Sequence, residues 1–455
     1  MPNIQYGKGA YRRDRGGLPE MRLVNMWLEA TPSSDQGIML QSRPGLESYA
    51  SVGNGPVAGG FSQDGSFGGD SFSVSGGSLY RGTTLIGAID GSGPVSFAAS
   101  ALELLVTAGS NLWRYDGSTL SAVAFPDGAN VSAVAFLKGY FVAARADSHK
   151  LYFSGVLDGS SWEAFDFVSA ESKPDTIRGV YKVRDELWLA GGETVEFFAP
   201  TGDGDAPFQA IEARQYDKGM LAVGAGALAD NTLFFVNSDG LVCRGGAVPE
   251  RISDNGIEER IAESASVTVF GFTFEGHAFF GLRLDAGTWQ YDAATKQWSE
   301  LQSHGETRWR VQSAWMVGDT PQFGDDSEGT IWRFGDVWAD DGDPLVRLFT
   351  AVAPLNGVGV IDNLRIWANV GRTKILTGHG ADPVVEMRSS DDAGVTWGPW
   401  DEAPLGAQGQ YREPAEWRRL GMFDFPGMVA EIRCTEPTDF RVSRVAVNEA
   451  GGGRA

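Results

Sequence analysis

Residues Thr232–Arg244 read TLFFVNSDGLVCR, and this stretch decides the fold because it contains one complete β-hairpin. Strand-forming residues open it, Asp239-Gly240 occupies the expected tip, and a second short apolar strand follows. Asp-Gly is favoured at such a tip because tight hairpin turns require positive φ. A sheet built from such hairpins cannot bury both of its faces alone, so it must stack against neighbouring sheets.

The same pattern, an apolar strand, a short turn and a second strand rich in aromatic residues, recurs along the middle of the chain. The other copies are Ser71–Arg81, Leu104–Tyr115, Tyr140–Phe153, Glu186–Phe198, Ala278–Tyr291 and Gln322–Phe334. Their second strands are 33 to 47 residues apart, close to the roughly 40–50 residues of a four-stranded propeller blade. The sequence therefore predicts an all-β protein with a six- or seven-bladed β-propeller. An array of β-sandwich hairpins would show similar turns.

The repeat divides the chain into three predicted regions. We expect an extended N-terminal arm over residues 1–45, the propeller over 46–344, and a β-sandwich-like domain over 345–455 that ends in a flexible tail. Segments such as Asn363–Val370 and Phe440–Val447 alternate polar and apolar residues, as half-buried strands do. The best helix signal is Ser253–Ser264, where Asp254 is predicted to cap the N-terminus.

Charge is distributed unevenly along the 455 residues, whose formal net charge is −22. Residues 46–344 carry 41 acidic and 19 basic side chains, whereas residues 1–45 carry six basic and four acidic ones. The acidic body is expected to repel nucleic acid, although an acidic surface kept for solubility explains the charge equally well. Four arginines near the start form a candidate assembly arm, expected to order against an acidic neighbour: Arg12, Arg13, Arg15 and Arg22.

Segments that would direct the chain to a membrane or out of the cell are not apparent. Residues 1–26 are polar and basic, unlike a signal peptide, and no apolar run approaches the roughly 18 residues of a membrane span. We therefore expect a protein without a membrane anchor that stays soluble where it is made. Cys243 and Cys434 are far apart, which favours free buried thiols in a reducing compartment over a disulfide.

Patterns that carry catalysis or metal binding are missing as well. The four histidines are scattered singly, without the spacing of metal ligands: His149, His277, His304 and His379. No nucleophile elbow, phosphate-binding loop or zinc-protease helix occurs in the sequence. We expect no catalytic residue, no cofactor and no metal.

Three loop motifs are interpreted as structural. Asp325-Asp326 and Asp340-Asp341 lie in glycine-rich loops and are predicted to be solvated turns, with calcium binding as the alternative. Gly224–Ala229 resembles a Gly-x-Gly-x-x-Ala dinucleotide loop, but that function needs a following helix. Here the strand Thr232–Val236 follows almost at once, so we predict an ordinary loop.

An Asp-box pattern, Ser-x-Asp-x-Gly-x-Thr-Trp, matches Ser390, Asp392, Gly394, Thr396 and Trp397 without mismatch. We expect Asp392 to accept hydrogen bonds from turn amides, Gly394 to supply an unusual backbone conformation, and Trp397 to pack under the hairpin. Sialidases carry such boxes on propeller blades, so a glycosidase is the functional alternative. The box is structural in those enzymes too, and this copy lies outside the repeat.

Short segments in consistent order over residues 20–440 resemble the tail nozzle proteins of short-tailed bacteriophages, also called tail accessory or packaged-DNA stabilisation proteins. The segments are Leu23–Met26, Ser42–Leu46, Gly55–Gly60, Ser78–Tyr80, Asp158–Trp162, Glu186–Leu189, Pro207–Gln209, Arg251–Ser253 with Ile257-Glu258, and the Asp-box. Ala58 stands where the family is expected to have an arginine, which leaves any role of that position open.

This resemblance implies a structural protein of the virion tail, made in the host cytoplasm and without catalysis. It further implies a hexameric ring below the head-to-tail connector, contacted by adaptor proteins and by tail spikes, fibres or a plug, through which DNA passes without specific binding. The sequence therefore supports two hypotheses of function. The first is a structural conduit for genome retention and ejection, and the second is a carbohydrate-binding or sialidase-like propeller that recognises a host receptor.

Overall fold

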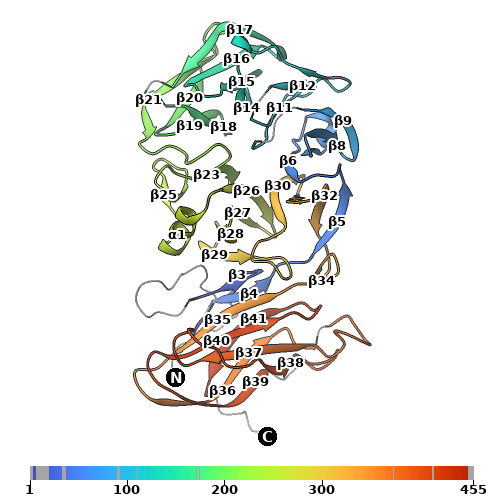
Figure 1. Cartoon of the computed structure of the whole chain (residues 1–455), viewed down its shortest axis with the longest axis vertical. Coiled ribbons are helices and arrows are strands. Elements are labelled where there is room, and N and C mark those ends of the chain that lie inside the picture. The colour runs from blue at the N-terminus through green and yellow to red at the C-terminus, as the bar shows by residue number, and fades with distance from the viewer. Residues whose placement is uncertain are drawn as a thin grey trace.

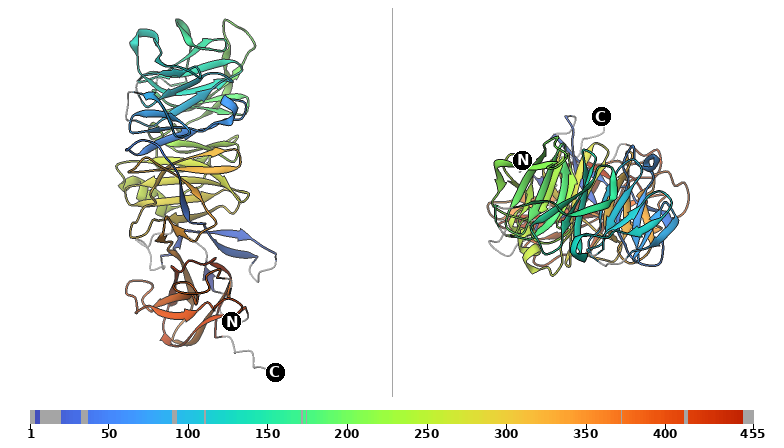
Figure 2. Two further views of the ribbon diagram at one scale, coloured as in Figure 1. Left: turned by 90° about the vertical axis from the view of Figure 1, so that its right-hand side faces the viewer. Right: turned by 90° about the horizontal axis from the view of Figure 1, so that it is seen from above.

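The computed structural model describes residues 4–6, 20–32, 37–89, 93–109, 111–170, 172–173, 175–371, 373–411 and 414–448. The molecule is elongated, with a β-propeller at one end and a β-sandwich at the other (Figures 1 and 2). The predicted propeller and sandwich are thus confirmed. In the part of the chain just defined, no helix is long and apolar enough to cross a membrane. The predicted flexible tail, residues 451–455, lies outside the described residues.

The propeller has seven blades of four antiparallel strands each, and the strands of blade 6 belong to a larger sheet. Blade 1 consists of β6 (Val57–Phe61), β7 (Phe72–Ser75), β8 (Ser78–Arg81) and β9 (Thr84–Ala88). Blade 2 consists of β10 (Ser96–Ala99), β11 (Leu104–Thr107), β12 (Trp113–Tyr115) and β13 (Leu120–Ala122). Blade 3 consists of β14 (Val131–Leu137), β15 (Tyr140–Arg145), β16 (Lys150–Gly155) and β17 (Asp158–Ser169). Blade 4 consists of β18 (Ile177–Val183), β19 (Glu186–Gly191), β20 (Val195–Pro200) and β21 (Phe208–Tyr216). Blade 5 consists of β22 (Gly226–Ala229), β23 (Thr232–Val236), β24 (Val242–Arg244) and β25 (Glu250–Arg251). Blade 6 consists of β26 (Thr268–Phe274), β27 (His277–Leu284), β28 (Gly287–Asp292) and β29 (Gln297–Leu301).

Blade 7 closes the ring by joining segments from the two ends of the propeller sequence. Three of its strands are β30 (Val311–Val317), β31 (Thr320–Asp325) and β32 (Thr330–Phe334). The fourth is β5 (Leu46–Ser51), which pairs antiparallel with β32. The innermost strand β30 then lies against β6 of blade 1. This closure settles the expected blade number at seven.

The hairpin Thr232–Arg244 shows why the blades stack. Every residue of β23 is buried, because both faces of a blade pack against its neighbours. The one α-helix among the described residues, α1 (Asn255–Glu263), lies between blades 5 and 6, with the Asp254 side chain accepting from the Ile257 amide as predicted. Ile257 and Ile261 of this helix are buried in the core that those blades share. Two short 3-10 turns, η1 (Phe67–Gly69) and η2 (Pro126–Gly128), complete the connections.

Two sheets form the sandwich. One has the order β3-β4-β41-β36-β39, and the other contributes β2, β35, β40, β37 and β38, with β1 paired to β35. The bounds are β1 (Gln5–Tyr6), β2 (Leu23–Val24), β3 (Met26–Ala30), β4 (Ile38–Ser42), β35 (Arg347–Pro354), β36 (Gly359–Ala368), β37 (Val384–Ser390), β38 (Asp401–Pro404), β39 (Ala415–Phe423), β40 (Gly427–Cys434) and β41 (Arg441–Val447). A hairpin of β33 (Ala339–Asp340) and β34 (Asp343–Pro344) precedes β35. One apolar core fills the space between the two sheets.

The predicted extended arm over residues 1–45 needs a correction. Within the described residues of this region, β1 to β4 are strands of the sandwich sheets. β2 also pairs parallel with β29 of blade 6 through Val24 and Glu300, so a single ten-stranded sheet runs from the propeller into the sandwich. The physical reason is burial: Leu23, Val24 and Met26 are almost completely covered, which an arm in solvent would not allow.

Candidate functional site: the joint between propeller and sandwich

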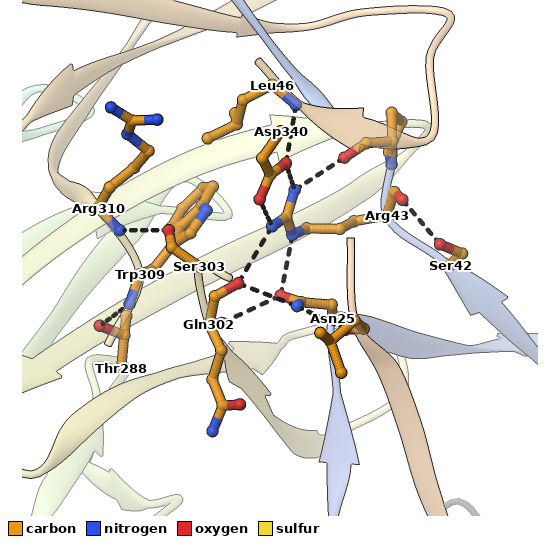
Figure 3. Close-up of polar contacts among 12 residues, drawn as sticks. Asn25, Ser42, Arg43, Leu46, Thr288, Gln302, Ser303, Trp309, Arg310 and Asp340 are labelled. Atoms are coloured by element: carbon orange, nitrogen blue, oxygen red, sulfur yellow. Dashed lines mark hydrogen bonds and ion pairs between the residues drawn. The ribbon is translucent and has the colours of Figure 1, made fainter. Parts of the chain in front are cut away.

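A buried ion pair lies where the two domains meet (Figure 3). The Arg43 guanidinium donates to both carboxylate oxygens of Asp340, at 2.8 and 2.6 Å. Their side chains are only 1% and 3% exposed. The same carboxylate accepts from the Leu46 amide at 3.0 Å, where blade 7 begins. Arg43 also lies 5.4 Å from the ring centre of Trp309, a buried residue between blades 6 and 7.

Asn25 completes this joint. Its backbone has a positive φ of 54°, and its side chain uses all of its hydrogen-bonding capacity. The amide nitrogen donates to the carbonyls of Gln302 and Val346, while Oδ1 accepts from Arg43 Nε and from the Gln302 amide. Asn25 therefore connects β2, the segment after β29 and the start of β35. A fully satisfied buried network of this kind fixes one arrangement of the elements that it joins.

The carboxylate pairs predicted to be solvated turns are different in the structure. Asp340 is buried against Arg43, and Asp325 is 0% exposed. Asp325 accepts from Arg310 Nε at 3.0 Å and from the Trp332 indole at 2.9 Å. Buried carboxylates require such partners because an unpaired charge is very costly in a protein interior. The prediction of solvated turns is thus wrong for one residue of each pair.

A second polar cluster joins β3 to blade 6. His277 Nδ1 lies 2.9 Å from Asp292 Oδ2, and its Nε2 lies 2.8 Å from Glu29 Oε2. The hydrogen bond to Asp292, supported by that to Glu29, raises the His277 pKa to about 9. The imidazolium therefore persists at neutral pH and holds a carboxylate from each domain.

Alternating charges extend across one face of the continuous sheet. Arg22, at the start of β2, makes a bidentate contact with Glu300 of β29 at 3.1 and 2.7 Å. Glu431 of β40, whose side chain is largely buried, pairs with Arg388 of β37. The charge of Glu431 also raises the pKa of Arg22, after the larger contribution of Glu300. Arg22, predicted as part of an assembly arm, is thus located inside the joint. Arg12, Arg13 and Arg15 lie outside the described residues.

The Asp-box forms a compact turn after β37. The Asp392 carboxylate accepts from the amides of Val395 and Thr396 and from the Thr396 hydroxyl, which holds its pKa well below its usual range. Ser390 Oγ donates to Asp392 and accepts from the Gly394 amide. Gly394 has φ of 88°. The side chains of Ser390, Asp392 and Thr396 therefore bond to one another and to amides of the turn, as a structural role requires.

Trp397 connects the Asp-box to the N-terminal strands. It packs against a small cluster of Met21, Val352 and Val429, so it lies beside the residue that precedes Arg22. The Arg388 guanidinium is 4.7 Å from the ring centres of both Trp397 and Trp400. The structure therefore brings the Asp-box and Arg22 to one sheet face, a proximity that nothing in the sequence indicated.

The axis of the propeller is obstructed. Gly224, before β22 of blade 5, lies so close to Pro94, before β10 of blade 2, that a Cβ on Gly224 would be 2.7 Å from the proline ring. These blades are not neighbours, so the contact crosses the axis. The cavity that remains measures about 620 Å³ and is lined by innermost strands without any charged side chain. The Gly224–Ala229 motif leads into strand β22, and no helix follows it to bind a dinucleotide.

The remaining reactive side chains are dispersed. Cys243 is buried in the propeller and Cys434 in the sandwich, and both are free thiols. Burial raises the Cys243 pKa to about 11 and also raises that of Cys434. Among the residues whose placement is described, no group of three histidine, cysteine or carboxylate side chains could hold a metal ion.

Two protein-family models together match nearly the whole chain. A family model described as "Bacteriophage P22 Gp10, beta-propeller" matches residues 2–336. A second model, "Bacteriophage P22 Gp10, beta-sandwich", matches residues 346–449. No curated protein matches the sequence.

Solved structures resemble the chain only distantly. The extracellular domain of a putative hybrid two-component system from B. thetaiotaomicron shares 9% identity at a TM-score of 0.43, over 75% of this chain and 45% of that one. PorZ of the type-IX secretion system of Porphyromonas gingivalis shares 12% at 0.39, over 71% and 45%. The computationally designed protein Ika8 shares 14% at 0.38, over 72% and 100%. This chain thus spans less than half the length of the first two structures.

Proposed function

The chain belongs to the bacteriophage P22 Gp10 family of tail nozzle and packaged-DNA stabilisation proteins, and on this premise we propose that it retains the packaged genome and guides its ejection as a closed ring of identical subunits, six by family resemblance. It is a component of the virion tail. We further propose that it is made in the host cytoplasm, acts without catalysis or cofactor, and meets adaptor proteins and tail spikes, fibres or a plug.

The observation that carries this proposal is the match of both domains to the family in a single chain with one continuous architecture. Two physical features support a conduit. The obstructed axis excludes duplex DNA from the propeller itself, so the path must lie between copies. The 41 carboxylates of residues 46–344 outnumber 19 basic side chains, so this body repels a polyanion within about 8 Å at physiological salt.

The contacts at the joint are those expected of a subunit that must keep its shape under mechanical load. Arg43–Asp340, His277 with its two carboxylates, and the sheet shared by β29 and β2 all oppose movement of the sandwich against the propeller. Rigid subunits keep a ring's lumen at constant width. Arg12, Arg13 and Arg15 remain a proposed assembly segment, and trypsin should cut at these sites in the free protein but spare them in virions.

Genome retention tests the proposal directly. Particles assembled without this protein should package DNA and then lose it, measured as DNase-sensitive DNA over hours after assembly. Supplying the purified protein to filled particles should restore protection. DNA that stays fully protected in particles lacking the protein would overturn the proposal.

A further inference from the structure

The seam where the propeller ring closes, between blades 7 and 1, contains an open cleft of about 850 Å³. Its floor is apolar, with Ile86 of β9, Val317 of β30 and Ile331 of β32. Tyr49 of β5 stands at its rim and is 51% exposed. The volume falls within the roughly 300–1,000 Å³ that is typical of ligand sites. The proposed function gives this cleft no role.

The connection at the seam is the shortest one between neighbouring blades. At the other joints the segment entering the next blade is at least seven residues long, whereas only residues 52–56 link β5 to β6. Those longer segments bury side chains between blades, as Phe125 and Trp309 do. The core at the seam has only four buried residues, Val52, Val57, Trp315 and Ile331, the fewest of any blade-to-blade core in the described part of the propeller.

Polar groups in the cleft are already oriented for a ligand. Gln322 is only 5% exposed, and its Oε1 accepts from Ser71 Oγ, which in turn accepts from the Trp315 indole. Its Nε2 group makes no hydrogen bond to a described residue, and Gln322 is among the residues that line the cleft, so this donor is available to a ligand. Arg81 is held by Asp70 at 2.6 Å and keeps about a third of its side chain exposed. The cleft therefore presents fixed donors beside an apolar floor.

We propose that this cleft receives an extended segment of a different tail polypeptide, which completes the seam as the chain's own segments complete the other six. This inference rests on the proposed function. The segment would place an apolar side chain on Ile86, Val317 and Ile331 and a carbonyl oxygen against Gln322 Nε2 and Arg81. A polypeptide is favoured because the other joints are filled by polypeptide, and because an acidic body disfavours a nucleic acid.

Charge favours a different protein as the source of the segment, and tethering argues against the chain's own basic stretch. Residues 46–344 carry 41 acidic and 19 basic side chains, so a segment from a less acidic protein approaches this body more readily. The chain's own basic stretch, residues 7–19, is bounded by β1 and β2, which both pair with β35 in the sandwich. The two elements that flank residues 7–19 are thus both strands of the sandwich.

Photo-crosslinking in intact virions tests the inference. A benzoylphenylalanine at Tyr49 should crosslink to a polypeptide other than this chain, identified by mass spectrometry. The same probe at Val248, an exposed residue of blade 5, serves as the control and should not reach that polypeptide. A second variant, Gln322→Glu in the probe-bearing chain, keeps the acceptor for Ser71 and removes the Nε2 donor. The crosslink yield should then fall at least fivefold, while the melting temperature of the free chain should change by no more than a few degrees.

The experiment distinguishes failure of this inference from failure of the proposed function. No crosslink at position 49, a crosslink only to a second copy, or a yield that Gln322→Glu leaves unchanged would each overturn the inference, because the chain is present in the virions examined. A virion tail that contains no copy of the chain would instead overturn the proposed function on which the inference rests.

Discussion

Replacing Asp340 with alanine should be among the most destabilising single changes in the joint. The variant leaves the Arg43 guanidinium buried without its counter-ion and removes the acceptor of the Leu46 amide. Breaking a buried pair on one side costs about 3–5 kcal/mol. Arg43 keeps hydrogen bonds to Asn25 Oδ1 and to the Pro44 and Gln302 carbonyls, so we expect a loss of about 3 kcal/mol.

Urea unfolding monitored by tryptophan fluorescence measures this loss. Asp185→Ala is the matched control, because Asp185 pairs with Lys138 at the surface with side chains 76% and 53% exposed. Exposed ion pairs contribute little to stability, so that variant should hardly change the free energy of unfolding. Changing Arg43 to methionine and Asp340 to leucine together removes both buried charges and should be less harmful than Asp340→Ala alone. If Asp340→Ala costs no more than Asp185→Ala, the reasoning about the joint is refuted.

Three further outcomes are expected. The His277 pKa is raised from 6.5 to about 9 in the folded protein, so the contribution of the imidazolium to folding stability is complete below pH 6.5 and is lost as pH rises through 9. The free energy of unfolding, measured from pH 6 to 10, should therefore fall by up to about 3 kcal/mol. His277→Gln should remove this dependence on pH. Asp392→Ala should lower the melting temperature by calorimetry, whereas Asp391→Ala, a neighbour outside the turn's hydrogen bonds, should not; equal effects would contradict a structural Asp-box. Fluorescence anisotropy of labelled duplex DNA at 20 mM salt should not change as the full chain is added up to micromolar concentrations. Replacing Arg12, Arg13 and Arg15 with serine should abolish any weak binding. Salt-dependent binding that survives those replacements would indicate a surface that binds DNA.

Local periodicity was enough to predict the blades, because each hairpin carries its own strands and turn within one short stretch. Thr232–Arg244 is an example, and the Asp254 cap of α1 is another signal that is complete within a few residues. The Asp-box likewise contains its donors and acceptors within eight positions.

The joint could not be predicted in the same way, because its partners are far apart in the chain. Arg43 and Asp340 are 297 residues apart, and the glycines around Asp340 resemble an ordinary solvated turn. β2 is only two residues long, too short to show any periodicity, and it is a strand only because β29 and β35 flank it. The predicted arm over residues 1–45 is wrong for its described residues because the local sequence does not encode the contacts that place β1 to β4 in the sandwich sheets.

Cryo-electron microscopy of the virion tail can show whether this chain surrounds the DNA path. We expect a closed ring of copies of this chain around that path below the connector, each with the propeller and sandwich in the arrangement held by Arg43 and Asp340. DNA density should run between copies and not along any propeller axis. The proposed conduit is wrong if the DNA path is lined by other proteins, with this chain absent or outside the ring.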